Sequence, residues 1–156
     1  MTDLLDIYLN DHLAGATAGV ELARRLRASN EGDPELGPAL AGVCTEIEQD
    51  RETLEAVMGR LGVGRSRIKP AAALVAERLG RLKLNGRLRG YSPLSRLAEL
   101  EALQVGVGGK RLLWRSLEHT HADDLPGFEL GALAERAADQ VRRLEALHLK
   151  AASRAL

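Results

Sequence analysis

The sequence predicts an all-α protein, a four-helix bundle in a single domain, from three observations. Ala, Leu, Glu and Arg, which all favour helices, dominate the 156 residues. Residues that favour strands are scarce, and aromatic residues make up only 3% of the chain. Four long segments repeat apolar residues with a period near 3.6, and one domain of this length can bury a substantial core. Together these observations exclude a β-rich fold.

The four helices are placed by their apolar stripes and by the residues at their ends. We expect them at about residues 3–29, 34–62, 93–121 and 128–155. Three of the starts carry a capping side chain or a proline suited to the first turn, namely Thr2 or Asp3, Asp33 before Pro34, and Ser92 before Pro93. The connections inside the first and the last pair are short, so each pair should pack antiparallel as a helical hairpin.

The connection between the two hairpins, residues 63–92, differs from the other two. It is too long for a simple loop between neighbouring helices. Its apolar residues recur at helical spacing over about residues 69–84, which predicts a shorter helix there. The chain is therefore expected to consist of two helical hairpins joined by a long crossover that itself carries a helix.

A short motif in the last predicted helix points to a known family. This helix contains Glu145-Ala-Leu-His148, a Glu-x-x-His, whereas the second helix offers only Glu48-Gln-Asp-Arg51 or Glu46-Ile-Glu-Gln49. Two hairpins, a long second connection and this motif resemble the ferritin-like superfamily, and in particular its small bacterial members without an assigned function. In the iron-binding members, one helix of each pair gives a Glu and the other gives Glu-x-x-His. Arginine cannot bind a metal, so the resemblance covers the fold better than the ligand set.

Polar residues near the centre of each apolar stripe form the candidate site. They are His12, Arg51, Glu101 with Gln104, and His148. One interpretation is a buried polar cluster in which these groups satisfy one another. The other is a degenerate metal or small-molecule site, and its metal ligands would be His12, Glu101, Glu145 and His148. The resemblance implies iron or manganese for such a set, but four carboxylates and two histidines are not all present, so we expect no cofactor.

Charge is segregated along the chain although the net charge is zero. Residues 1–59 carry a net charge of −8, residues 60–96 a net charge of +9 and the remaining residues a net charge of −1. The basic patch lies on the crossover and comprises Arg65, Arg67, Lys69, Arg78, Arg81, Lys83, Arg87 and Arg89. It is expected to pack against the acidic first hairpin, while binding of phosphate or nucleic acid, or contact with a membrane surface, is the alternative. The scarcity of aromatic residues argues against recognition of single-stranded nucleic acid.

Glycines interrupt the third predicted helix in an unusual way. Gly106 and Gly109 lie at helical spacing with Ala102, although glycine inside a helix is unfavourable by about 1 kcal/mol relative to alanine. Such a run suggests that another helix approaches closely, either the crossover helix or a second subunit. The sequence does not decide between these two, and a homodimer is expected independently of them.

The remaining features bound the function without naming it. The single cysteine, Cys44, lies on an apolar stripe and is expected to be an inert core residue. The start of the chain does not read as a signal peptide, and no apolar run approaches the roughly 20 residues of a membrane span, so a cytoplasmic protein is expected. No phosphate loop, dinucleotide fingerprint or Ser-His-Asp pattern is found. We expect a non-enzymatic helical scaffold or interaction protein, with a degenerate metal-dependent oxidoreductase or a phosphate binder as alternatives.

Overall fold

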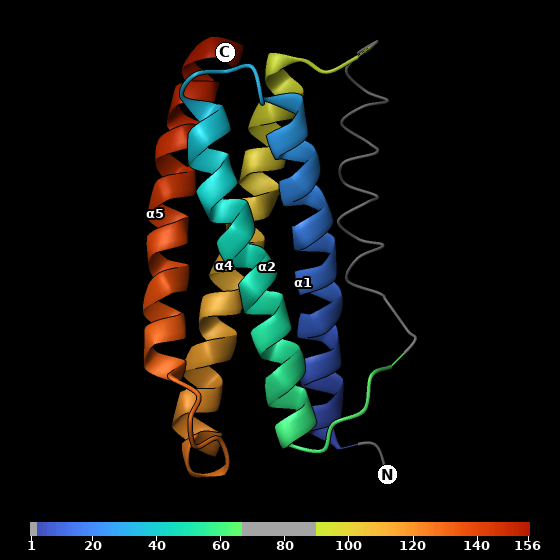
Figure 1. The fold of residues 1–156 in the computed structure, drawn as a ribbon. Coiled ribbons are helices and arrows are strands. Elements are labelled where there is room, and N and C mark those ends of the chain that lie inside the picture. Colours follow the sequence, from blue (N-terminus) through green and yellow to red (C-terminus); the bar gives the residue numbers. More distant parts are fainter. Residues whose placement is uncertain (1–2, 67–89) are drawn as a thin grey trace.

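A computed structural model describes residues 3–66 and 90–156 of the chain (Figure 1). Within these ranges it contains four α-helices and one short 3₁₀ helix and has no strand. Their bounds are α1, Leu4–Ser29; α2, Leu36–Arg60; α4, Pro93–His121; η1, Ala122–Asp124; and α5, Leu130–Ala155. The all-α prediction is confirmed for these residues. The predicted short helix at about residues 69–84 lies outside the described residues.

The helix ends follow from the capping residues. The side chain of Ser92 accepts a hydrogen bond from the backbone amide of Ser95 at 3.1 Å, so α4 begins at Pro93 as predicted. Asp3 caps α1 by accepting from the amide of Leu5 at 3.3 Å. The Asp33 carboxylate accepts from two backbone amides, one of them that of Leu36 at 2.9 Å. The two residues after Asp33 form a turn, and α2 therefore begins slightly later than predicted.

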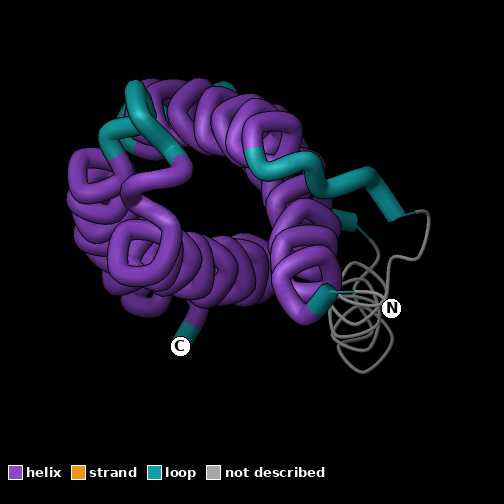
Figure 2. Tube along the Cα trace, turned by 90° about the horizontal axis from the view of Figure 1, so that it is seen from below, coloured by secondary structure: helices purple, strands orange, loops and turns teal. Residues whose placement is uncertain are grey.

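The four helices form a ring when the molecule is viewed along its long axis (Figure 2). The most extensive packing joins α4 to α5, followed by α1 to α2 and α1 to α4, whereas α2 touches α5 only lightly. Leucines from every helix fill the centre, among them Leu54 of α2 and Leu144 of α5, both fully enclosed. Cys44 is buried as predicted, and its Sγ atom lies 3.1 Å from the carbonyl oxygen of Ala23. Burial raises the pKa of this thiol above its ordinary value.

Ion pairs join α2 and the turn before it to α5, where apolar packing is slight. Four acidic side chains of the first segment meet four basic side chains of the second, in the order expected for neighbouring helices of opposite direction. The pairs are Asp33 with Arg154, Glu35 with Lys150, Glu46 with Arg143, and Asp50 with Arg136. We call this row the α2–α5 charge seam.

The charge seam changes how the acidic first hairpin is neutralised. The net charges of the three segments predicted that the basic crossover would pair with these acids, because residues 97–156 carry a net charge close to zero. In the described ranges, Glu46 and Asp50 of α2 contact α5 instead. Glu48 of α2 pairs with Arg24 of α1. Arg65 is the exception from the predicted basic patch, because it pairs with Glu55 at 3.0 Å.

None of the helices in the described ranges combines the length and the apolar character that crossing a membrane requires.

Candidate functional site

The structure does not bring the polar residues selected from the sequence together in one buried cluster. His148 of α5 contacts Glu101 of α4 through Nε2 and Oε1 at 3.0 Å, but the Glu101 side chain is 58% exposed. His12 and Arg51 lie elsewhere, on a cavity between α1, α2 and α4. Of the predicted cluster, Glu101 and His148 therefore lie on an outer surface and His12 and Arg51 at an inner cavity, whereas half-buried Gln104 is not among the residues that line the cavity.

The predicted metal ligands are separated in the same way. His12 lines the cavity, whereas Glu101 and His148 form their pair across α4 and α5, and Glu145 is exposed. Among the residues that the structure describes, no three His, Cys, Asp or Glu side chains come together closely enough to hold a metal ion. The residues present therefore do not fit a ferritin-like iron or manganese centre.

The predicted basic patch falls mostly outside the described residues. Arg67, Lys69, Arg78, Arg81, Lys83, Arg87 and Arg89 all lie in residues 67–89, of which the structure gives no description. Arg65 is described and largely exposed, and its guanidinium pairs with Glu55 of α2.

A buried carboxylate, Asp50 of α2, is the polar centre that the sequence analysis missed. Its side chain is only 1% exposed, and it accepts hydrogen bonds from Lys110 of α4 and from Arg136 and Gln140 of α5. The residue predicted from the sequence was the next one, Arg51, whose side chain is 32% exposed and whose nearest acid is Glu55 at 3.9 Å. One residue corresponds to a turn of about 100° around a helix, which is enough to exchange an inner for an outer position.

The Asp50 group belongs to a network that links α2, α4 and α5. The Lys110 ammonium also donates to Oε1 of Gln140 at 2.6 Å. The Gln140 amide donates in turn to Glu46 at 3.0 Å, and Glu46 accepts from Arg143. Burial lowers the pKa of Lys110, and the nearby Asp50 carboxylate acts in the opposite direction. Every member of this chain of contacts has a partner of complementary charge or hydrogen-bonding capacity.

A second buried acid lies on α4 near its start. Glu99 is almost fully enclosed and accepts from Arg25 of α1 at 3.0 Å. Nearby, buried Asn30 donates to the Tyr91 hydroxyl at 2.8 Å and accepts from Arg96. Burial raises the pKa of Tyr91. These contacts tie the end of α1 to the beginning of α4.

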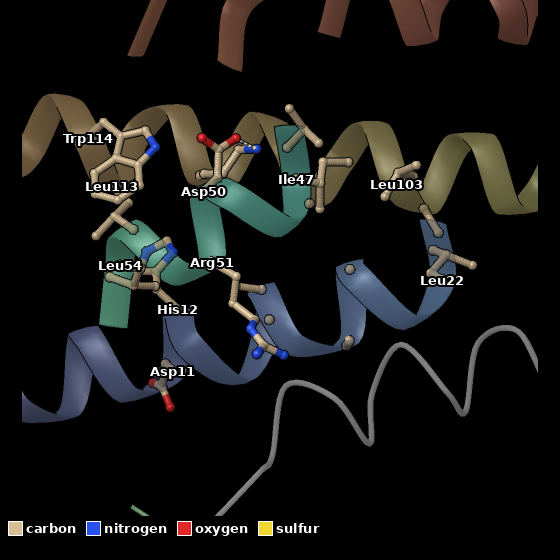
Figure 3. A pocket seen from close by; sticks show the side chains of 18 of the residues that line it. Asp11, His12, Leu22, Ile47, Asp50, Arg51, Leu54, Leu103, Leu113 and Trp114 are labelled. Carbon is tan, nitrogen blue, oxygen red and sulfur yellow. Dashed lines mark hydrogen bonds and ion pairs between the residues drawn. The ribbon is translucent and has the colours of Figure 1, made fainter. Parts of the chain in front are cut away.

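A cavity of about 370 Å³ opens between α1, α2 and α4 (Figure 3). Its walls are mostly apolar, with large side chains supplied by Leu22, Ile47, Leu54, Leu103, Val107 and Leu113. Small residues face it from two helices, among them Gly19 of α1 and Gly106 of α4. A Cβ atom built at either glycine would meet no atom within 4 Å among the described residues, so neither one is required by close helix packing there. The same holds for Gly109, where the sequence suggested an approaching helix.

Polar side chains reach the cavity from all three helices, and they are Tyr8, Asp11 and His12 of α1, Asp50 and Arg51 of α2, and Lys110 and Trp114 of α4. His12 stacks edge to face against Tyr8 with ring centroids 4.6 Å apart, and burial lowers its pKa although Asp11 acts to raise it. Lys110 and Trp114 both reach the cavity from α4. Trp114 is 0% exposed, and within the described ranges its indole N–H has no hydrogen-bond partner. The cavity thus combines a large apolar surface with one unused buried donor.

Comparison of the chain with family models, with curated proteins and with solved structures finds no match in any of the three.

Proposed function

We propose that this chain is a non-enzymatic ferritin-like helical protein that binds a small, largely apolar molecule in the cavity between α1, α2 and α4. The cavity is the observation that carries the proposal. Ligand sites are typically a few hundred Å³ in volume, mostly apolar, and furnished with a small number of polar groups. The cavity of about 370 Å³ has this size and this composition.

The ferritin-like arrangement is supported by connection lengths. Few residues separate α1 from α2 and α4 from α5, while residues 61–92 separate α2 from α4. Sequence neighbours also pack against each other within each pair (Figure 1). This pattern is the one found in bundles with a single long crossover.

The contacts of the buried Asp50 carboxylate favour ligand binding over metal-dependent oxidation. Both oxygens of Asp50 already accept hydrogen bonds, and two of the donors are the cations Lys110 and Arg136. A metal ion at Asp50 would have to displace these cations and would be repelled by them. Binding of phosphate through the basic patch gains no support from Arg65, which pairs with Glu55.

A homodimer is also proposed, through the outer face of α4. Val105 and Leu112 on this helix are 74% and 61% exposed, and they are one heptad apart. Gly108 lies between them and has open space where a side chain would be. An exposed apolar strip of this kind suits the approach of the same strip on a second copy. Sedimentation equilibrium of Val105→Glu should then give monomer where the unaltered protein gives dimer, and a dimer in both would refute this interface.

The binding proposal is tested with the uncharged fluorophore N-phenyl-1-naphthylamine. We expect a saturable rise in its fluorescence with the unaltered protein. Gly19→Leu should abolish the rise by filling the cavity, because a side chain at this position meets open space. Gly42→Leu is the matched control, since Gly42 is an exposed helical glycine with equally open surroundings that does not line the cavity.

Melting curves of both variants show whether they fold. Both should be at least as stable as the unaltered protein, because replacing a helical glycine generally favours the helix. Equal probe binding by folded Gly19→Leu and Gly42→Leu would refute the cavity as the binding site, as would the lack of saturable binding by the unaltered protein.

A further inference from the structure

The indole nitrogen of Trp114 is a buried hydrogen-bond donor for which the described part of the chain supplies no acceptor. Its side chain is 0% exposed, and the N–H has no partner among the described residues. Indole nitrogen can only donate, and buried donors in folded proteins are nearly always paired. In Figure 3 the nitrogen lies on the edge of the ring that faces Asp50, among the residues that line the cavity. A molecule in the cavity can supply the acceptor that the described residues do not.

Lys110 lies beside Trp114 and has capacity for one more acceptor. The two residues are four apart on α4, which places their side chains on the same face of the helix. An ammonium group has three N–H donors, and the described contacts of Lys110 use two of them, to Asp50 and to Gln140. The Lys110 side chain lines the cavity and is 13% exposed.

The charges around Trp114 and Lys110 favour an anionic ligand. Asp50 is in contact with two cations, Lys110 and Arg136, so the three groups together carry a net positive charge. Arg51 adds a cation on the cavity wall, with Glu55 only at 3.9 Å. The cavity acid Asp11 is exposed to solvent, where its charge is screened more strongly than the charges inside.

We infer that the ligand of this cavity is an apolar carboxylate, whose head accepts hydrogen bonds from Trp114 Nε1 and Lys110 Nζ while its hydrocarbon body lies against the leucines. A carboxylate has two oxygens and accepts only, so it matches two adjacent donors. The mostly apolar walls match a hydrocarbon body. This inference rests on the proposed function, because it names the class of molecule that the same cavity binds.

Trp114 is the only tryptophan in the chain, so its own fluorescence reports on the inferred contact. Decanoate, titrated below its micelle concentration, should shift the Trp114 emission to longer wavelength in a saturable way, because hydrogen bonding at the indole nitrogen lowers the energy of its excited state. Decyltrimethylammonium, which has the same chain and a cationic head without an acceptor, is the matched control. It should cause no such shift at equal concentration.

A variant measures the contribution of the indole donor. Trp114→Phe keeps an aromatic ring but removes the N–H, and decanoate is then followed by displacement of N-phenyl-1-naphthylamine. We expect its apparent affinity for decanoate to fall about tenfold, as expected for loss of one hydrogen bond to a charged group, while the affinity for the uncharged fluorophore stays within about twofold.

The possible results distinguish failure of the carboxylate inference from failure of the proposed binding in the cavity. If the fluorophore binds in the cavity but decanoate and decyltrimethylammonium displace it equally well, the carboxylate inference is overturned and cavity binding stands. An unchanged decanoate affinity in Trp114→Phe overturns it too. If the fluorophore itself does not bind, or binds equally to Gly19→Leu, the proposed function fails. The emission titration uses the unaltered protein, so it decides the matter even if the variant does not fold.

Discussion

Replacing Asp50 by alanine should destabilise the bundle strongly, because it leaves two cations without their shared carboxylate. Lys110 is the more serious loss, since it is largely enclosed by α2, α4 and α5, whereas the Arg136 side chain is 31% exposed and can turn toward water. Removing one partner of a buried ion pair generally reduces the free energy of unfolding by about 3–5 kcal/mol. For a chain of this size, that range corresponds to a fall in melting temperature of roughly 9–15 °C.

The neighbouring residue is a sensitive control for this prediction. Arg51→Ala changes a partly exposed side chain with one distant ion pair, so we expect a change within about 0.5 kcal/mol. Urea unfolding followed by circular dichroism at pH 7 measures both variants. A larger loss in Arg51→Ala than in Asp50→Ala would mean that α2 is rotated by about one residue from its position here, and would refute the buried network. The double variant Asp50→Leu/Lys110→Met should be more stable than Asp50→Ala, because it leaves no unpaired charge on Lys110.

Three further predictions concern the core, pH and salt. Leu54→Ala and Leu144→Ala should each reduce the free energy of unfolding by about 2–5 kcal/mol in urea titrations, and near-normal values would place these leucines outside the core. Burial holds the His12 pKa below its ordinary value near 6.5, although Asp11 acts to raise it. As the pH falls, the unfolded state therefore takes up a proton before the folded state does, and the protein loses stability between about pH 7 and pH 5. This loss should be smaller in His12→Gln. Glu46→Gln should weaken the fold by about 1 kcal/mol in dilute buffer and less as sodium chloride is added, because its contact with Arg143 is partly exposed; an effect independent of salt would contradict this.

Helix positions could be predicted from the sequence because local signals determine them. The predicted bounds of α1 and α4 differ from those observed by at most one residue, since Asp3 and Ser92 cap these helices through their own side chains. The start of α2 was placed two residues early. Pro34 suits a first helical turn, but in the structure it belongs to the turn that Asp33 closes.

The inner polar residues were harder to predict because they depend on helix rotation. Asp50 lies three residues after Ile47 and four before Leu54, both buried, and this spacing was the available signal. Gln140 was missed for the same reason: it is fully buried, three residues after Ala137 and four before Leu144, which are also buried. The residue type of a charged or amide side chain suggests exposure to solvent. Asp50 and Gln140 are buried because they contact side chains of other helices, and the sequence of one helix does not show such contacts.

Contacts across helices cannot be derived from the periodicity of one helix. Lys110 follows a glycine-rich stretch on α4, and its partners Asp50 and Gln140 are 60 and 30 residues away in the chain. The cavity has the same origin, because it depends on how three helices are spaced. The apolar periodicity of each helix predicts which side faces inward, but it does not predict where the inner faces leave space.

The α2–α5 charge seam gives the four sides of the bundle different responses to the solvent. Three sides are held largely by apolar contact, which salts such as sulfate strengthen because they are excluded from protein surfaces. The exposed pairs of the fourth side, such as Lys150 with Glu35, weaken as mobile ions screen them over about 8 Å at physiological ionic strength. Hydrogen exchange in sodium chloride and in sodium sulfate would therefore separate the two kinds of side. The bundle should open first along the line between α2 and α5.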